Sequence, residues 1–219
     1  MPATSQTRTV EAASGSSRDR SLRNLLFLFL LTVFAFALAG YHPGLEDDSF
    51  YLAAIKWRLN PSLFPHDADY FRVQFQATIF DKLIALSVHL THLPLPWVAL
   101  LWQVAAVFFL LHGCWRLARR CFDKPEAHWA AAALVASLFT MPIGGIAINI
   151  GDQYLHPRII ATAVVLEAIV EVIDTRIWLA GLLLASAFQS TPFRLASEFP
   201  FAFFSGGRSV RATTRDLQQ

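Results

Sequence analysis

Hydrophobic residues along this chain are gathered into blocks that short polar stretches separate. The blocks cover residues 22–41, 96–115, 128–148, 155–173 and 177–188. A bilayer core about 30 Å thick needs roughly 20 apolar residues per helix, and the first four blocks approach that length. The pattern predicts an all-α, polytopic integral membrane protein with about five transmembrane helices.

Basic residues indicate how these helices are oriented. Arginines stand at the start of the first block and just after the second: Arg18, Arg20, Arg23, Arg116, Arg119 and Arg120. Because Lys and Arg gather on the cytoplasmic side of a membrane, we expect the N-terminus in the cytoplasm and the second helix to run inward. The protein would then lie in the inner membrane of a cell, with residues 42–95 as a large outer loop.

The predicted outer loop, residues 42–95, contains two helical stretches of its own. The first, residues 48–59, ends at an Asn-Pro helix stop. The second, residues 73–93, carries Asp81 and Lys82 near its middle, where each charge inside a bilayer would cost about 2.5–3.5 kcal/mol. We therefore predict two amphipathic helices on the membrane surface rather than a further span.

The two ends of the chain are more polar than the hydrophobic blocks. Residues 1–21 are rich in Ser, Thr and Ala and predict a disordered cytoplasmic tail. The residues 37–39 resemble a signal-peptidase site, so cleavage there is an alternative for the first block. Residues 189–219 are polar and basic, and the predicted topology places their arginines outside, against the positive-inside rule. A truncated or frame-shifted C-terminus, or a tail that never crosses the membrane, would explain this.

Composition excludes several functional classes. The chain is 55% hydrophobic and 16% charged, whereas soluble domains are about 45–50% apolar and about 25% charged. A disordered protein, a disulfide scaffold and an ordinary cytosolic enzyme are excluded. The net charge of +2 and the lack of a basic stripe argue against nucleic acid as a partner. No nucleotide-binding or metal motif is present, so we predict no cofactor, and membrane lipids are the expected partners.

Three consecutive acidic residues, Glu46, Asp47 and Asp48, lie shortly after the first block. Carboxylates at a membrane surface can act as general bases or bind substrate. The alternative is that Asp47 or Asp48 simply caps the following helix, which contributes about 1 kcal/mol. Both interpretations remain open at the level of sequence.

A second polar cluster lies between the third and fourth blocks. It contains Asp152, His156 and Arg158, and the predicted topology puts it in the same compartment as the acidic run. The two loops could therefore build one site over the bilayer surface. The alternative is ordinary turn chemistry, in which a Gly-Asp pair turns the chain and His156-Pro157 opens a helix.

The fourth block carries carboxylates along one helical face. Glu167, Glu171 and Asp174 are spaced at i, i+4 and i+7. Carboxylates inside a membrane are candidates for proton relays, so a proton-coupled transporter component that uses Glu167 is one alternative. In the other, Glu167 stays protonated or faces a partner helix that this chain does not supply.

The run YHPGLEDDSFYL at residues 41–52 resembles the multi-pass membrane glycosyltransferases of the type C fold. The stretch LFPHD at residues 63–67 is similar to uncharacterised bacterial membrane proteins of the same layout. The resemblance covers roughly residues 20–160. It implies that Asp47 or Asp48, in preference to Glu46, is the base toward the acceptor, and that a polyprenyl-phosphate lipid in the outer leaflet donates the sugar. Glu46 is assigned to substrate binding.

No motif of this family corresponds to Asp152, His156 or Arg158, which we assign to substrate binding on chemical grounds. An Arg at the start of an outer helix could pair with a lipid phosphate. The chain has fewer spans than type C enzymes, so the alternatives to an active or incomplete glycosyltransferase are a non-catalytic membrane subunit or a fragment.

Overall fold

The computed structural model describes residues 4–45, 47–66, 68–77, 79–139 and 151–190, and these residues form helices and turns with no strand among them. The helices follow one another as α1 Thr4–Ala39, α2 Asp48–Leu59, the short 3-10 helix Pro61–Leu63, α3 Ala68–Ala77, α4 Ile79–Thr91, α5 Leu95–Cys121, α6 Pro125–Ser137, α7 Pro157–Ile173 and α8 Ile177–Ser190. The all-α class that the sequence predicts is confirmed for these parts of the chain.

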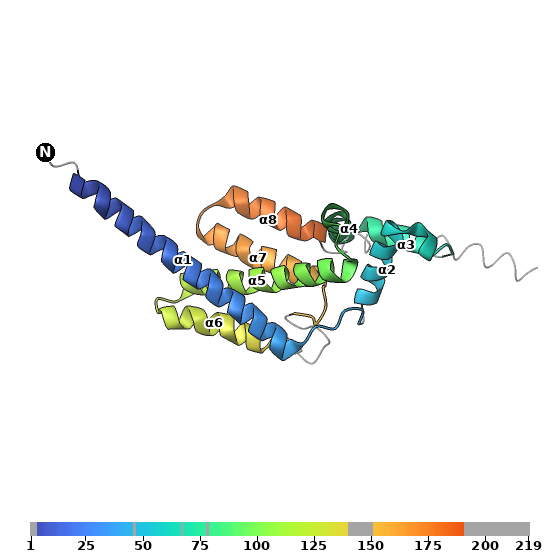
Figure 1. Cartoon of the computed structure of the whole chain (residues 1–219), viewed down its shortest axis with the longest axis horizontal. Coiled ribbons are helices and arrows are strands. Elements are labelled where there is room, and N and C mark those ends of the chain that lie inside the picture. The colour runs from blue at the N-terminus through green and yellow to red at the C-terminus, as the bar shows by residue number, and fades with distance from the viewer. Residues whose placement is uncertain (1–3, 46, 67, 78, 140–150, 191–219) are drawn as a thin grey trace, which may run out of the picture.

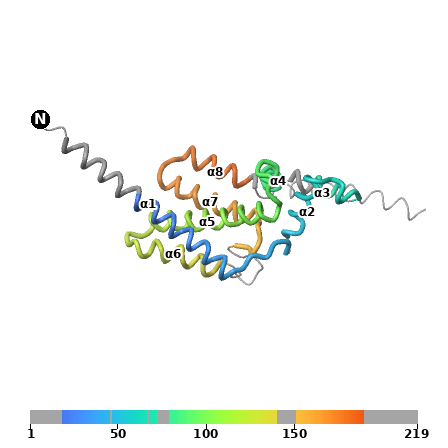
Figure 2. Tube along the Cα trace, in the orientation of Figure 1, coloured from blue at the N-terminus to red at the C-terminus, as the bar shows by residue number. Residues whose placement is uncertain are grey.

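Helix α5 lies at the centre of the molecule. It packs against α7 on one side and α6 on the other, while α8 covers α7 and α1 crosses α5 and α6 (Figure 1). The small helices α2, α3 and α4 gather at the end of the bundle where α5 begins, and the trace in Figure 2 shows the same arrangement. The bundle thus has two ends, one built from α2–α4 and one from the C-terminal end of α5.

Apolar side chains from five segments form the main core. Its buried members are Leu28, Ala35, Ala106, Val107, Leu110, Leu111, Trp115, Ala132, Ala136, Phe139, Ile159 and Ala163. Alanines on α6 and α7 let these helices approach α5 closely, as small residues do between helices in membranes. Phe27 on α1 meets Trp129 on α6 edge-on, with ring centroids 4.7 Å apart. The core holds α1, α6 and α7 around α5.

A second apolar cluster attaches the small helices to the bundle. Tyr51 and Ile55 of α2 pack with Phe80 and Ile84 of α4 and with Val98 near the start of α5. These side chains are almost completely buried. The cluster therefore fixes α2, and the acidic residues at its start, against the N-terminal end of α5.

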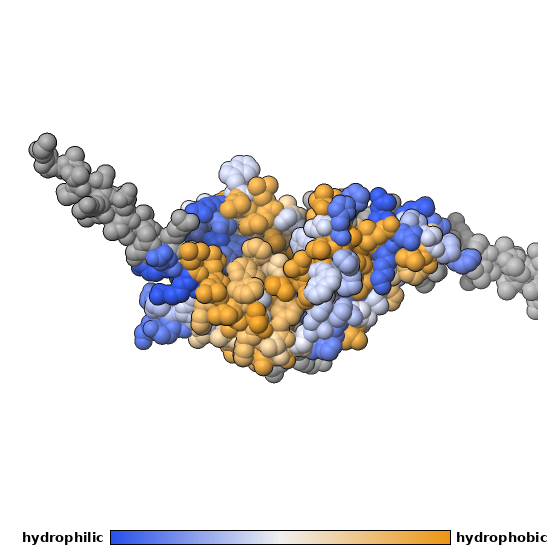
Figure 3. Space-filling view, viewed as in Figure 1, coloured by the Kyte–Doolittle hydropathy of each residue, from blue (hydrophilic) through white to orange (hydrophobic). Residues whose placement is uncertain are grey.

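Much of the outer surface of the bundle is apolar. Figure 3 shows a hydrophobic band between two hydrophilic ends, and α1 leaves Leu22, Leu26 and Leu30 more than half exposed, at 57%, 59% and 55%. Among the described residues, two helices are long and apolar enough to cross a membrane: the Asp19–Ala39 part of α1, and α5. These two are candidates by length and composition, and the five spans stay a prediction.

The described helices in the other three predicted spans are shorter than a full membrane crossing. Helix α6 ends at Ser137, and residues 140–148 of the third predicted span lie outside the described residues. Helix α7 has 17 residues and α8 has 14, so both are shorter than a full crossing of about 20 residues. The two helices are joined by a turn at Thr175, which has a φ of 63°.

The structure changes two of the predicted boundaries and confirms a third. Helix α2 has the predicted range of 48–59. Residues 73–93 do not form one helix, because α3 ends at Ala77 and α4 begins at Ile79. The reason is tertiary: α3 packs against α2, whereas α4 also packs against α5 and α8. At the N-terminus, α1 begins at Thr4, so residues expected to be disordered continue the first helix.

Candidate functional site

The two acidic residues at the start of α2 have different surroundings. Asp48 is 3% exposed, and its Oδ2 accepts a hydrogen bond from the backbone N–H of Gly44 at 2.6 Å. Asp47 occupies the N-cap position but makes no capping hydrogen bond with its side chain, which is 62% exposed. The proposed capping role is therefore absent for Asp47, and its carboxylate is the one open to solvent.

Burial also changes the acidity of Asp48. Loss of water raises the pKa of its carboxyl group to about 6, although the Gly44 hydrogen bond and the charge of Lys56 act in the opposite direction. Gly44 itself has a φ of +84°, a left-handed conformation that glycine adopts without strain. Asp48 thus titrates near neutral pH and holds the turn that leads into α2.

His156 approaches Asp47 from the segment that precedes α7. Its Nδ1 accepts a hydrogen bond from the backbone N–H of Arg158 at 3.0 Å, which caps the helix. In the neutral ring the proton is therefore on Nε2, and this atom lies 3.8 Å from Oδ2 of Asp47. That distance is an electrostatic contact rather than a hydrogen bond.

The imidazole of His156 is enclosed on several sides. Tyr51 and Tyr154 meet it edge-on, with ring centroids 5.5 and 6.1 Å away, and Oδ2 of Asp152 lies 3.9 Å from its Nδ1. Burial and the charge of Arg158 lower the pKa of His156 to about 4, against the opposing effect of Asp47. The ring is therefore neutral at pH 7. Burial likewise raises the pKa of Tyr51 to about 12.

Arg158 adds a positive charge to this group of residues. Its Nη1 atom is buried and has no hydrogen-bond acceptor among the described residues. A guanidinium donor without a protein acceptor is suited to a carboxylate or phosphate oxygen from a ligand. Arg158 is thus the residue of the site that is best suited to an anion.

Hydrogen bonds explain why two distant loops meet here. The side chain of Gln103 on α5 donates to the carbonyl of Asp152 at 2.9 Å. The side chain of Gln153 donates to the carbonyl of Ala39 at 2.6 Å, and the backbone N–H of His42 donates to the carbonyl of Gln153 at 2.8 Å. The loop before α7 is therefore held by α5 and by the end of α1, next to the start of α2.

The structure brings together most of the residues that the sequence singled out. Asp47, Asp152 and Arg158 surround His156, and Asp48 lies beside them with its carboxylate turned to Gly44. Glu46 lies outside the described residues. Sequence reasoning missed Tyr51 and Gln103. Tyr51 follows Asp47 at i+4, so the helical period alone could have placed both on one face of α2.

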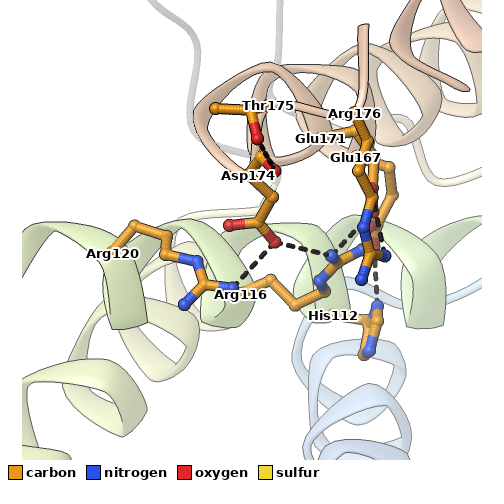
Figure 4. A network of polar contacts seen from close by, with 8 residues as sticks. All are labelled: His112, Arg116, Arg120, Glu167, Glu171, Asp174, Thr175 and Arg176. Atoms are coloured by element: carbon orange, nitrogen blue, oxygen red, sulfur yellow. Dashed lines mark hydrogen bonds and ion pairs between the residues drawn. The ribbon is translucent and has the colours of Figure 1, made fainter. Parts of the chain in front are cut away.

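A second polar cluster joins α5 to α7 and the following turn (Figure 4). Glu167 accepts from Nη1 of Arg116 at 2.5 Å and lies 2.6 Å from Nδ1 of His112. Arg116 also donates to Glu171 at 2.7 Å, and Arg120 donates to Asp174 at 2.7 Å. The alternative in which Glu167 faces a helix that this chain does not supply is wrong, because α5 supplies His112, Arg116 and Arg120 at the matching helical spacing.

Neither cluster has the composition of a metal centre. Within the described ranges, no group of three or more His, Cys, Asp or Glu side chains is arranged to hold a metal ion. Comparisons with protein-family models, with curated proteins and with solved structures give no match. Geometry and chemistry therefore carry the assignment of function.

Proposed function

We propose that the chain is a multi-pass protein of a cell's inner membrane, with its N-terminus in the cytoplasm. The support is the distribution of charge over the bundle. The segment of α1 with Arg20 and the end of α5 with Arg119 line one cavity, so the basic residues expected on the cytoplasmic side lie at one end of the molecule. The site around His156 lies toward the opposite end, on the side of the small helices.

We propose further that this outer site transfers a sugar from a polyprenyl-phosphate donor. One observation carries the proposal: the exposed carboxylate of Asp47 lies beside the buried His156 and the loop of Arg158, which come from a distant part of the chain. A carboxylate open to solvent and a guanidinium with an unused donor are the two groups that the reaction needs.

In the proposed reaction, the Asp47 carboxylate takes the proton from an acceptor hydroxyl group. The acceptor oxygen then forms a bond to the anomeric carbon of the sugar, and the bond between that carbon and the phosphate oxygen breaks. The lipid phosphate leaves with the electron pair, and Arg158 stabilises its negative charge. Neutral His156 presents its Nε2–H on the side of Asp47, 3.8 Å from Oδ2 of that carboxylate.

Donor turnover tests this proposal. The full chain in lipid nanodiscs is incubated with polyprenyl-phosphate sugars, and release of polyprenyl phosphate is measured. We expect Asp47→Asn to reduce release by about 100-fold or more, as loss of a general base does. Asp69→Asn, which removes an exposed carboxylate on α3, is the matched control and should retain activity.

The alternative is a membrane subunit or fragment without catalytic activity. Absence of turnover by the unmodified chain with every polyprenyl-phosphate sugar tested would favour it. Turnover by the Asp47→Asn variant equal to that of an active unmodified chain would instead exclude Asp47 as the base. The transporter alternative loses support, because Glu167 is paired with Arg116 and His112 in an arrangement that joins α5 to α7.

A further inference from the structure

A cavity of about 600 Å³ lies between α1 and α5, at the end of the bundle opposite the Asp47 site. Arg20, Ser21 and Asn24 of α1 line one wall, and Arg116 and Arg119 of α5 line the other. Among the described residues of its walls, His112 is the one further ionisable group, so each ionisable side chain described there is a base. The charge of the cavity therefore favours an anionic ligand.

The arginines of this cavity are held in different ways. Arg116 is committed to Glu167 and Glu171, which neutralise it. Arg119 lies over the Trp115 ring at 4.7 Å, a cation–π contact that orients its guanidinium. Arg20 and Arg119 are the other guanidinium groups that line the cavity, and a guanidinium can bind two oxygens of one phosphate.

The surface beside the cavity is suited to hydrocarbon. Leu25 lines the cavity itself, and Leu22 and Leu26 on the same helix are 57% and 59% exposed. A basic hollow at the cytoplasmic end of two transmembrane helices, with apolar side chains next to it, is a known arrangement for anionic lipid headgroups. Inorganic phosphate would contact the basic residues, but it has no hydrocarbon chain to pack against the leucines.

From these observations we infer that the cavity between α1 and α5 binds the phosphodiester headgroup of an anionic phospholipid of the inner leaflet. Arg20 and Arg119 bind the phosphate, Ser21 and Asn24 donate hydrogen bonds to headgroup oxygens, and the acyl chains lie along the leucines of α1. The inference rests on the proposed orientation in the membrane, and it is independent of the proposed sugar transfer, which uses other residues at the other end of the bundle.

Native mass spectrometry of the full chain in detergent tests this site, with phosphatidylglycerol and phosphatidylcholine as probes. We expect tighter retention of phosphatidylglycerol. Arg20→Gln and Arg119→Gln should each weaken its binding about fivefold, the effect of one basic residue near an anionic lipid. Lys124→Gln is the matched control, because Lys124 is an exposed base at the same end of the bundle that does not line the cavity.

Three results would overturn the inference. Equal retention of the two lipids would remove the requirement for negative charge. An equal loss of binding in the Lys124→Gln variant would indicate diffuse surface charge instead of a site. Displacement of phosphatidylglycerol by millimolar inorganic phosphate would indicate a site for the free anion. Melting temperatures of the variants that match the unmodified chain show that any loss of binding is not a loss of folding.

Discussion

The Nε2 atom of His156 lies 3.8 Å from Oδ2 of Asp47, although the two residues are far apart in the sequence. The Nδ1 atom of the same ring is occupied by the N–H of Arg158. One hydrogen bond, which caps α7, therefore decides which nitrogen of His156 faces the acidic loop. The start of α7 and the start of α2 form one polar surface.

Stability should depend on pH through Asp48. The pKa of its carboxyl group rises from 3.8 to about 6 on folding, so the folded state holds the proton more tightly. Asp48 should therefore destabilise the fold as pH rises from about 4 to about 6, by roughly 3 kcal/mol for a shift of about two units. The measurement is the melting temperature of the unmodified chain minus that of Asp48→Asn, at pH 4 and at pH 7. The difference should fall as pH rises, and a constant difference would contradict the prediction.

The pair between Arg116 and Glu167 should be important to the packing of α5 on α7. Their side chains are 24% and 14% exposed, so Arg116→Met leaves a largely buried carboxylate without its cation and should cost about 3–5 kcal/mol. The double variant with Glu167→Leu should recover much of this loss. Unfolding in detergent measures both. Arg72→Gln at the exposed pair with Asp69 is the control and should change stability by less than about 1 kcal/mol.

Gly113 should be intolerant of a side chain. A Cβ at this position would lie 3.0 Å from Cβ of Leu166 on α7, so Gly113→Leu should push the helices apart and cost about 1–3 kcal/mol or more. Gly181 on α8 has nothing within 4 Å of such a Cβ. Gly181→Leu is therefore the matched control, and its melting temperature should stay the same or rise. Equal effects of the two substitutions would show that α5 and α7 do not approach closely.

The orientation of the bundle can be measured by cysteine labelling. After Cys114 and Cys121 are replaced by Ser, Leu83→Cys on α4 should react with a membrane-impermeant reagent added outside, since Leu83 is 37% exposed. Lys124→Cys at the opposite end should react only after the membrane is opened. Protection of position 83 together with external labelling of position 124 would reverse the proposed topology.

The sequence by itself determined the helical class and the range of α2. These features depend on apolar periodicity and on the Asn-Pro stop after residue 59. Charge placement also predicted that the acidic loop and the loop of His156 face the same side. Each of these signals acts over a few neighbouring residues, so the chain carries it without reference to packing.

Only the tertiary structure decided which side chains meet. The sequence treated Asp47 and Asp48 as equivalent, whereas the packing of α2 buries Asp48 and leaves Asp47 open. It left Glu167 without a partner, whereas the rotation of α5 against α7 brings Arg116 to it. The division of residues 73–93 into two helices likewise follows from the different partners of α3 and α4. Such contacts depend on the depth and rotation of one helix against another, and these are fixed by the core that the helices share rather than by local sequence.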